Sequence, residues 1–377
     1  EVRPLHSLRF LYLPGTVTYL EKNRLLKLPK IIGQLIALKA LVVGHNKLKH
    51  LPRELTEMVM LKILNAKNND LLNLPDLRDS LKNLSCLNLN QNRLTEISDW
   101  ITELPNLKIL SLSQNKLIEI PAKIDKLVNL ERLYLRQNKF NKIPISISRM
   151  YNLKGLYLSQ NKITKIPDWI VQLKRIKDFD IGQNKLTEIP EFITQLVELK
   201  RISFRGNNIV GVPDFIGQLN NLTGLDISEN NLKSIPRVIG QLVHLEMLFL
   251  NDNELEEIPD SIGQLVSLRR LNIGKNKFTN VPDVVQKLVH LDSLSLSENE
   301  LEELPDTISQ LVGLETLDLS KNKFTNVPDV VGQLVHLDWL SLSGNELEEL
   351  PEFIGKLVNL ETLDLSKNKF TNVPDVV

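Results

Sequence analysis

The sequence predicts an elongated α/β solenoid of stacked coils, and three observations support this. Asparagine recurs every 23 residues from Asn23 to Asn368 without an insertion or a deletion. The same leucine pattern frames each of these asparagines, as in LKALVVGHNKL at 38–48 and LETLDLSKNKF at 314–324. No linker or change of composition interrupts the 377 residues. Because a fixed period of about 20–50 residues indicates stacked repeats, we expect one continuous domain over 1–377.

The two ends of the chain are expected to differ from the middle. Residues 1–25 are predicted to form a degenerate N-terminal cap, because Gly15 and Thr18 stand where the repeat has leucine. Residues 26–377 are predicted to be regular repeats, the last of them truncated at Val377. A stack of coils needs caps because each coil buries its apolar face only against its neighbours.

The first half of each repeat predicts a short β-strand. Around Leu248 and Leu250 the apolar residues alternate with period two, which is typical of a strand with one buried face. We therefore expect Leu248 and Leu250 to point inward, and Met247, Phe249 and Asn251 to point to the other face.

The second half of each repeat predicts a short α- or 3₁₀-helix. Ile262 and Leu265 have near-helical spacing, and a proline precedes them at Pro259. Fifteen of the sixteen repeats carry this proline, and Ser98 replaces it once. Proline stops a continuing strand and suits the first helical turn, where its missing N–H is not needed.

The recurring asparagine predicts a ladder of buried side-chain hydrogen bonds. Each coil turns a corner inside the protein, and a carboxamide can satisfy the backbone groups left without a strand partner. The residues assigned to this structural ladder are Asn46, Asn69, Asn92, Asn115, Asn138, Asn161, Asn184, Asn207, Asn230, Asn253, Asn276, Asn299, Asn322 and Asn345.

Composition argues against several classes of partner. Lys and Arg together number 46, as do Asp and Glu, so the net charge is zero. Without a basic run, we expect no nucleic-acid partner. No apolar stretch approaches the roughly 18 residues that a membrane span requires. Cys86 is the only cysteine and cannot form an internal disulfide, which favours a bacterial or intracellular origin.

The sequence offers no convincing catalytic or metal site. His244, His290 and His336 share one repeat position, but two coils separate neighbours by roughly 10 Å, too far to share a metal ion. Asp178 and Asp180 supply too few oxygens for calcium. Cys86 has no histidine near it in the pattern. We therefore expect no metal, no cofactor and no enzymatic activity.

The pattern LPxxIGxLxxLxxLxLxxNxL resembles that of the leucine-rich repeat superfamily over essentially the whole chain. It is most similar to the 23-residue bacterial group that is abundant in spirochaetes. The resemblance implies a horseshoe with a concave parallel β-sheet and short α or 3₁₀ segments on the convex side. It also implies a non-catalytic protein-binding module, often exported, that engages host cell-surface or matrix proteins. Two alternatives stay open: an intracellular signalling scaffold for small GTPases, and the recognition domain of a larger enzyme.

We place the predicted binding surface on the concave face, at strand residues that point away from the core. Tyrosine and arginine, the residue types enriched at binding hot spots, are concentrated there, mainly between Arg132 and Arg205. The alternative is that Tyr134 and Tyr157, each at the middle of a strand, only stack on each other, and that Asp178 pairs with Arg201. The predicted partner-binding residues are Arg132, Tyr134, Arg136, Tyr157, Asp178, Asp180, Arg201, Arg205, Met247, Phe249, Arg270 and Trp339.

A second surface is suggested by aromatic residues on the outer flank. Trp169, Phe192 and Phe215 occupy one position of three consecutive repeats, and Trp100 and Phe353 are equivalent elsewhere. If exposed, they would form an apolar ridge. The alternative is that neighbouring side chains cover them.

The last hundred residues contain a longer, two-coil repeat. KNKFTNVPDVV at 275–285, 321–331 and 367–377 alternates with NELEELP at 299–305 and 345–351. This places basic Lys321 and Lys323 one coil from acidic Glu298, Glu300 and Glu346. We expect stabilising stripes of opposite charge here.

Overall fold

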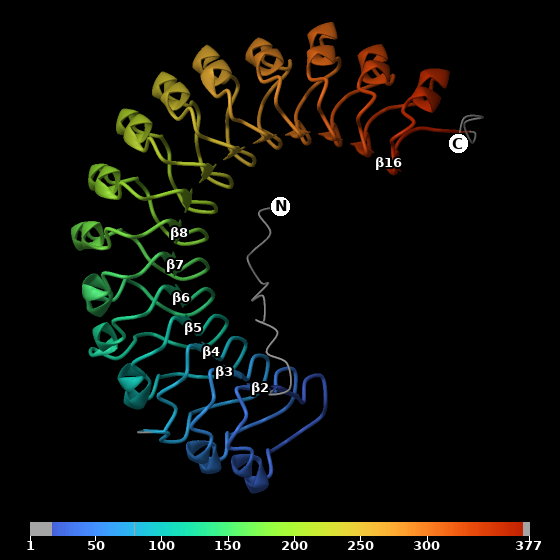
Figure 1. The fold of residues 1–377 in the computed structure, drawn as a ribbon. Coiled ribbons are helices and arrows are strands. Elements are labelled where there is room, and N and C mark those ends of the chain that lie inside the picture. The colour runs from blue at the N-terminus through green and yellow to red at the C-terminus, as the bar shows by residue number, and fades with distance from the viewer. Residues whose placement is uncertain (1–16, 79, 372–377) are drawn as a thin grey trace. The chain divides into compact units, whose positions relative to one another are not determined.

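The structure, a computed structural model, describes residues 17–78 and 80–371. It divides into two compact units, residues 1–161 and 162–377, which we describe separately. In each unit the strands line the inner side of a stack of coils and the short helices line the outer side (Figure 1). The predicted α/β solenoid with a parallel sheet is confirmed. Most of the predicted cap at 1–25, and the truncated end at Val377, lie outside the described residues.

Unit 1 contains a parallel sheet with its strands in chain order. Each strand pairs with the next in a register of one repeat, so that Tyr134 lies opposite Tyr157. The strands are β1 (Val17–Tyr19), β2 (Ala40–Val42), β3 (Ile63–Asn65), β4 (Cys86–Asn88), β5 (Ile109–Ser111), β6 (Arg132–Tyr134) and β7 (Gly155–Tyr157), and the 3₁₀-helices are η1 (Lys30–Gln34), η2 (Arg53–Glu57), η3 (Asp99–Glu103), η4 (Ile124–Lys126) and η5 (Ile145–Arg149).

Unit 2 repeats the same arrangement. Its strands are β8 (Asp178–Asp180), β9 (Arg201–Ser203), β10 (Gly224–Asp226), β11 (Met247–Phe249), β12 (Arg270–Asn272), β13 (Ser293–Ser295), β14 (Thr316–Asp318), β15 (Trp339–Ser341) and β16 (Thr362–Asp364). Its 3₁₀-helices are η6 (Asp168–Gln172), η7 (Glu191–Gln195), η8 (Asp214–Gln218), η9 (Arg237–Gln241), η10 (Asp260–Gln264), η11 (Asp283–Lys287), η12 (Asp306–Gln310), η13 (Asp329–Gln333) and η14 (Glu352–Lys356).

The core lies between the strands and the 3₁₀-helices and is built from the residues that the repeat predicts. Leu248 and Leu250 are completely buried, whereas Met247 and Phe249 are half-buried on the inner face. On the helical side Ile262 is also fully buried. A coil therefore presents its apolar residues to the coils on both sides of it, which is why the stack must be continuous within a unit.

The outer segments are 3₁₀-helices rather than α-helices throughout the described ranges, and in most of them the proline is the N-cap directly before the helix, as at η10. Pro259 is the N-cap, in an extended conformation (φ −70°, ψ 146°), and its carbonyl accepts the N–H of Ile262 at 3.0 Å. Proline fits here because its fixed φ is close to this value and its carbonyl alone closes the turn. Within residues 17–78 and 80–371, no helix is long and apolar enough to cross a membrane.

The asparagine ladder has the hydrogen bonds that the repeat predicted. Asn207 is typical: its Oδ1 accepts the N–H of Leu186 at 2.9 Å, and its Nδ2 donates to the carbonyls of Ile181 at 3.2 Å and Phe204 at 2.8 Å. Two of these three partners belong to the preceding coil. The side chain thus joins neighbouring coils and satisfies backbone groups inside the protein, where Asn207 is buried.

A second asparagine ladder was not predicted. It lies at an exposed position after the 3₁₀-helix, where each Nδ2 donates to a backbone carbonyl of the preceding coil at 2.8–2.9 Å. The pairs are Asn83 with Val59, Asn106 with Lys82, Asn129 with Pro105, Asn152 with Val128, Asn221 with Val197 and Asn359 with Val335. The signal was hidden because His244, His290 and His336 occupy the same position in other coils.

The residue before each ladder asparagine has a left-handed backbone conformation. Gln183 has a φ of 49° and Gly206 a φ of 65°. Most of these positions hold a residue other than glycine, although that conformation costs such residues about 1 kcal/mol. The corner of the coil therefore has strain that the ladder hydrogen bonds must offset.

The alternating charges of the two-coil repeat form the expected ion pairs. Lys321 Nζ lies 3.0 Å from Glu298 Oε1, and Lys323 Nζ lies 3.1 Å from Glu300 Oε2. Each exposed pair stabilises by at most about 1 kcal/mol, but like charges at the same positions would repel.

Replacing Asn207 by alanine is expected to lower the free energy of unfolding by about 1–3 kcal/mol, because the Leu186 N–H and two carbonyls lose their partner inside the protein. Urea unfolding measures this change. The matched control is Asn208→Ala, next to it in the sequence and exposed, which should change stability by less than about 0.5 kcal/mol. Equal losses for the two variants would contradict the ladder role of Asn207.

Candidate functional site

The inner face of each unit is formed by the first and third residues of every strand, while the second residue enters the core. In β6, Arg132 and Tyr134 are half-buried and Leu133 is fully buried. Tyr134 and its equivalents end their strands instead of lying at the middle as predicted, because each strand is only three residues long before the corner begins.

In unit 1 the predicted residues Arg132, Tyr134, Arg136 and Tyr157 come together on the inner face. The rings of Tyr134 and Tyr157 stack with their centroids 4.4 Å apart and an interplanar angle of 4°. Gly155 makes this possible, because a Cβ there would lie 2.9 Å from the Tyr157 ring. Arg136 Nε donates to Gln160 Oε1 at 3.1 Å. The result is a stacked aromatic pair on β6 and β7, with the half-buried residues Arg132 and Arg136 two positions before and two positions after Tyr134.

In unit 2 the predicted residues Asp178, Arg201 and Arg205 are engaged in ion pairs. Arg201 Nε donates to Asp178 Oδ1 at 2.5 Å, which is the structural pairing considered as an alternative. Arg205 Nη2 lies 2.5 Å from Glu229 Oε1, a partner that the sequence analysis did not identify. Both cations are therefore neutralised within the fold, and a partner must compete with these carboxylates.

Asp180 takes part in a turn that recurs at the end of many strands. Its Oδ1 accepts the N–H of Gly182 at 3.1 Å. The sequence contains a signal for this turn that the sequence analysis did not use. It is an Asp or Asn followed two positions later by a small or polar residue. The side chains that make this turn are Asn65, Asn88, Asp180, Asp226, Asn272, Asp318 and Asp364.

Asp226 is the most buried carboxylate of this row. Its Oδ1 accepts the Ser228 hydroxyl at 2.6 Å and the Ser228 N–H at 3.1 Å, and its Oδ2 accepts the Ser203 hydroxyl at 3.3 Å. Burial raises the pKa of the Asp226 carboxyl, and these hydrogen bonds oppose that shift only in part.

The remaining predicted residues lie farther along unit 2. Met247 and Phe249 on β11 are half-buried beside Arg270 on β12, which is exposed and lies opposite Met247. Trp339 on β15 is half-buried and does not belong to this cluster, because β13 and β14 lie between. The structure thus brings Met247, Phe249 and Arg270 together and leaves Trp339 apart.

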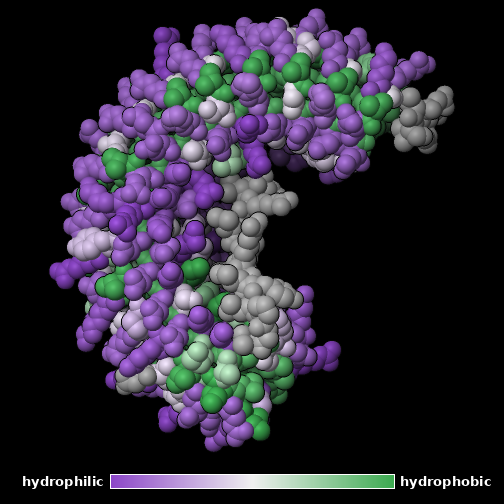
Figure 2. All heavy atoms as spheres, in the orientation of Figure 1, coloured by the Kyte–Doolittle hydropathy of each residue, from purple (hydrophilic) through white to green (hydrophobic). Residues whose placement is uncertain are grey.

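Two other sequence hypotheses concern Cys86 and the aromatic flank. Cys86 is buried, and burial raises the pKa of its thiol to about 11. Trp100 is buried, and Trp169, Phe192 and Phe215 are half-buried. The aromatic side chains therefore pack against their neighbours and do not form an exposed ridge. Figure 2 shows a largely hydrophilic surface in which hydrophobic atoms recur at intervals along the coils.

Comparison with known proteins identifies the class of protein that this repeat defines. Family models match the chain: Leucine rich repeat over 82–140, 128–186 and 289–347, Leucine-rich repeat region over 216–296, and Leucine Rich repeats (2 copies) over 335–376. The chain belongs to the leucine-rich repeat family. No curated protein sequence matches it.

Solved structures of this family resemble the chain over most of its length. A leucine-rich repeat protein of Leptospira interrogans is 37% identical with a TM-score of 0.80, and the match covers 94% of this chain and 90% of that one. The ectodomain of the Arabidopsis thaliana receptor kinase GASSHO1/SCHENGEN3, solved in complex with Casparian strip integrity factor 2, is 30% identical with a TM-score of 0.67. That match covers 95% of this chain but only 48% of the ectodomain, so the chain spans about half its length.

An internalin of Listeria monocytogenes, InlF, is 22% identical with a TM-score of 0.68, and the match covers 80% of this chain and 85% of that one. This similarity shows the fold alone. A parallel inner sheet carried by stacked coils is therefore common to bacterial and plant proteins whose remaining sequences differ.

Replacing Asp226 by asparagine should make unfolding depend less on pH. Because the pKa of Asp226 is raised in the folded protein, ionisation costs stability above that pKa, and the cost disappears below the ordinary Asp value. Asparagine can keep the turn, as Asn272 does with Gly274 at 3.0 Å. We expect Asp226→Asn to be more stable than wild type at pH 7 and equally stable at pH 3 in urea unfolding. A variant less stable at pH 7 would show instead that the charge stabilises the fold; Asp318→Asn, at a less buried position, is the control.

The Cys86 thiol should be nearly inert in the native protein. With a pKa of about 11, only about one thiol in a thousand is ionised at pH 8. We expect a disulfide reagent such as DTNB to label Cys86 slowly in buffer and rapidly in urea. Rapid labelling of the native chain would contradict both its burial and its raised pKa.

Proposed function

We propose that the chain is a non-catalytic protein-binding module that uses the inner faces of its two units. The observation that carries the proposal is the stacked pair Tyr134 and Tyr157 between Arg132 and Arg136. Aromatic rings and guanidinium groups supply large contact areas and directional hydrogen bonds, and they dominate binding energy at protein interfaces. Because the rings are already stacked, little conformational entropy is lost when a partner binds.

The cluster of Met247, Phe249 and Arg270 is proposed as a second contact area on the inner face of unit 2. It combines two apolar side chains with an exposed cation on neighbouring strands. Asp178, Asp180, Arg201 and Arg205 contribute a polar margin whose charges are largely paired. Trp339 stands as a separate anchor.

We further propose that the chain is an exported bacterial protein, secreted or held at the cell surface, that binds a host cell-surface or matrix protein. Support comes from the 37% identity to a Leptospira interrogans protein and from the fold shared with a Listeria monocytogenes internalin. The complex of the plant ectodomain with a protein factor supports protein ligands for this fold.

Exchanging both tyrosines for alanine should weaken partner binding at least about tenfold, because the proposed site loses both aromatic rings. Binding of the intact chain to immobilised laminin, fibronectin and collagen and to cultured mammalian cells is measured first, then repeated with Tyr134→Ala/Tyr157→Ala. Thermal unfolding should show a lowered but still cooperative transition, since the variant loses the stacking of about 0.5–1.5 kcal/mol and the apolar area that the two rings bury.

The matched control is Tyr134→Phe/Tyr157→Phe, which keeps the stacked rings. It should bind within a few-fold of wild type. Unaltered affinity of the alanine variant would move the site away from unit 1. Absence of binding to every host protein and cell type would contradict the exported, host-binding role.

A further inference from the structure

One flank of unit 2 carries an exposed apolar row. In six consecutive coils the second residue after the 3₁₀-helix is valine, and its exposed fraction lies between 42% and 83%. The row consists of Val243, Val266, Val289, Val312, Val335 and Val358. Exposure alternates from coil to coil: Val289 and Val335 are 44% and 45% exposed, whereas Val266 and Val312 are each 65% exposed. The surface is therefore corrugated with a period of two coils.

The fold does not require valine at this position. In other coils the equivalent residues are Lys82, Lys174 and Asn220. The backbone N–H of each makes the same hydrogen bond to the carbonyl two residues earlier as that of Val243. A partly exposed valine contributes less to stability than a buried one, because part of its side chain stays in water. An unbroken apolar row of this length on one flank is instead typical of an interaction surface.

An acidic row runs beside the valines at the N-terminal edge of the strands. Glu315, Asp338 and Glu361 occupy this position in three consecutive coils and are exposed. Within the described ranges no ion pair joins these three carboxylates to a lysine or an arginine. Most coils of unit 1 place lysine at the same position, as at Lys39 and Lys62, although one of them has Glu131 there. The acidic row is therefore not a requirement of the repeat.

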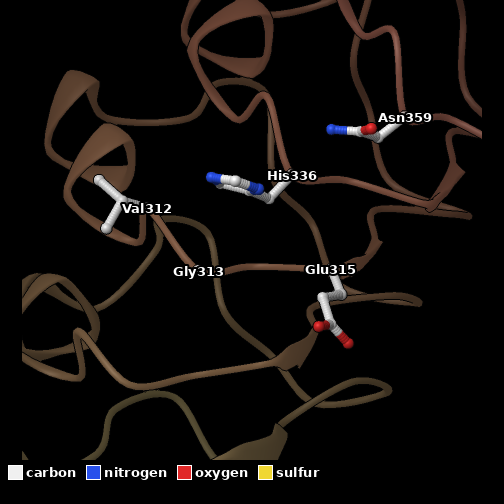
Figure 3. Close-up of a pocket in the computed structure, with 5 residues that line it drawn as sticks. All are labelled: Val312, Gly313, Glu315, His336 and Asn359. Carbon is white, nitrogen blue, oxygen red and sulfur yellow. The ribbon is translucent and has the colours of Figure 1, made fainter.

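An open depression lies beside the valine row at Gly313, the residue after Val312. It has a volume of about 440 Å³ and is lined by Val312, Gly313, Glu315, His336 and Asn359. A Cβ at Gly313 would meet no atom within 4 Å, so the space above its backbone is free. Figure 3 shows the His336 ring projecting toward Val312, while Gly313 presents only backbone. The depression exists because Gly313 has no side chain, whereas the coils on both sides of it carry His290 and His336 at this position.

We propose that this flank of unit 2 is a docking surface for a basic, amphipathic α-helix of a protein partner. Apolar residues of the helix would cover the valine row, with one side chain entering the depression at Gly313. Lysine or arginine on one edge of the helix would face Glu315, Asp338 and Glu361. The acidic row gives the surface the wrong sign for an anionic lipid surface, whereas it complements a basic protein segment.

The coils of unit 2 spread apart from the strands toward the 3₁₀-helices (Figure 1), so open positions two coils apart, near Ser267 and Gly313, are farther apart than two strand spacings, or roughly 10 Å. An α-helix advances about 5.4 Å per turn, so side chains two to three turns apart on one face of the helix can reach both positions. This surface is separate in its residues from the inner faces, and its role does not depend on the function proposed for them.

A synthetic peptide of about 18 residues, which as a helix is about 27 Å long and can span several coils, tests the proposal with the intact chain. The peptide has leucine along one face and lysine along one edge, and a second peptide has glutamate in place of lysine. Fluorescence anisotropy should show saturable binding of the lysine peptide and binding at least tenfold weaker for the glutamate peptide. Equal binding of the two peptides, or tighter binding of the chain to phosphatidylserine vesicles than to neutral vesicles, would overturn the proposal.

Three variants locate the site. Gly313→His, which copies the residue at His336, should fill the depression and weaken binding of the lysine peptide about tenfold or more. Val312→Asn, which copies Asn220, should do the same. Val197→Asn is the matched control, because Val197 is 64% exposed at the same repeat position but lies outside the row.

The fold of each variant is checked by its thermal unfolding, which should match wild type because the chain already uses these residues at these positions. Wild-type affinity of both Gly313→His and Val312→Asn, or an equal loss in Val197→Asn, would contradict the assigned surface. Tyr134→Ala/Tyr157→Ala should leave peptide binding unchanged, which separates this surface from the inner-face proposal.

Discussion

The hydrogen bonds of the ladder asparagines set the constraint on which the other features depend. Each side chain bonds to backbone groups 21 and 26 residues earlier, so its geometry is correct only when every coil has the same length. A coil of another length would leave several buried polar groups without partners, at a cost of about 1–3 kcal/mol each. Equal coil length in turn places residues of the same repeat position side by side in neighbouring coils, as a continuous row within each unit.

Because the coils are in register, the residues that maintain the fold and the residues available for binding occupy different positions of each coil. The leucines and asparagines are nearly invariant along the chain, while strand residues and flank residues vary from coil to coil. The two candidate surfaces differ in how their charges are used. On the inner face of unit 2, Arg201 and Arg205 are already paired with carboxylates. Beside the valine row of unit 2, Glu315, Asp338 and Glu361 are exposed next to apolar side chains. The inner face therefore depends on shape and aromatic contact, and the flank on hydrophobic contact with electrostatic complementarity.

Local and periodic features could be predicted from the sequence, and features that depend on lateral neighbours could not. The alternation of Leu248 and Leu250 and the phase of the asparagines fixed the strands, the core and the ladder, because both signals repeat in every coil. The Arg205–Glu229 pair and the carbonyl bonds of Asn83 were missed, because each depends on which group the neighbouring coil places opposite. The turn at Asp180 was also missed, although it lies within one coil and its pattern recurs in the sequence.

The alternation of charge between coils has a consequence for how such a gene can change in length. Lys321 and Lys323 meet Glu298 and Glu300 only because acidic and basic coils follow one another. Unequal recombination that removed one coil would bring two lysine rows or two glutamate rows into contact, whereas removal of two coils would restore the original neighbours. Selection should therefore tolerate length variants that differ by even numbers of coils, and the tract grows or shrinks as a dimer of repeats.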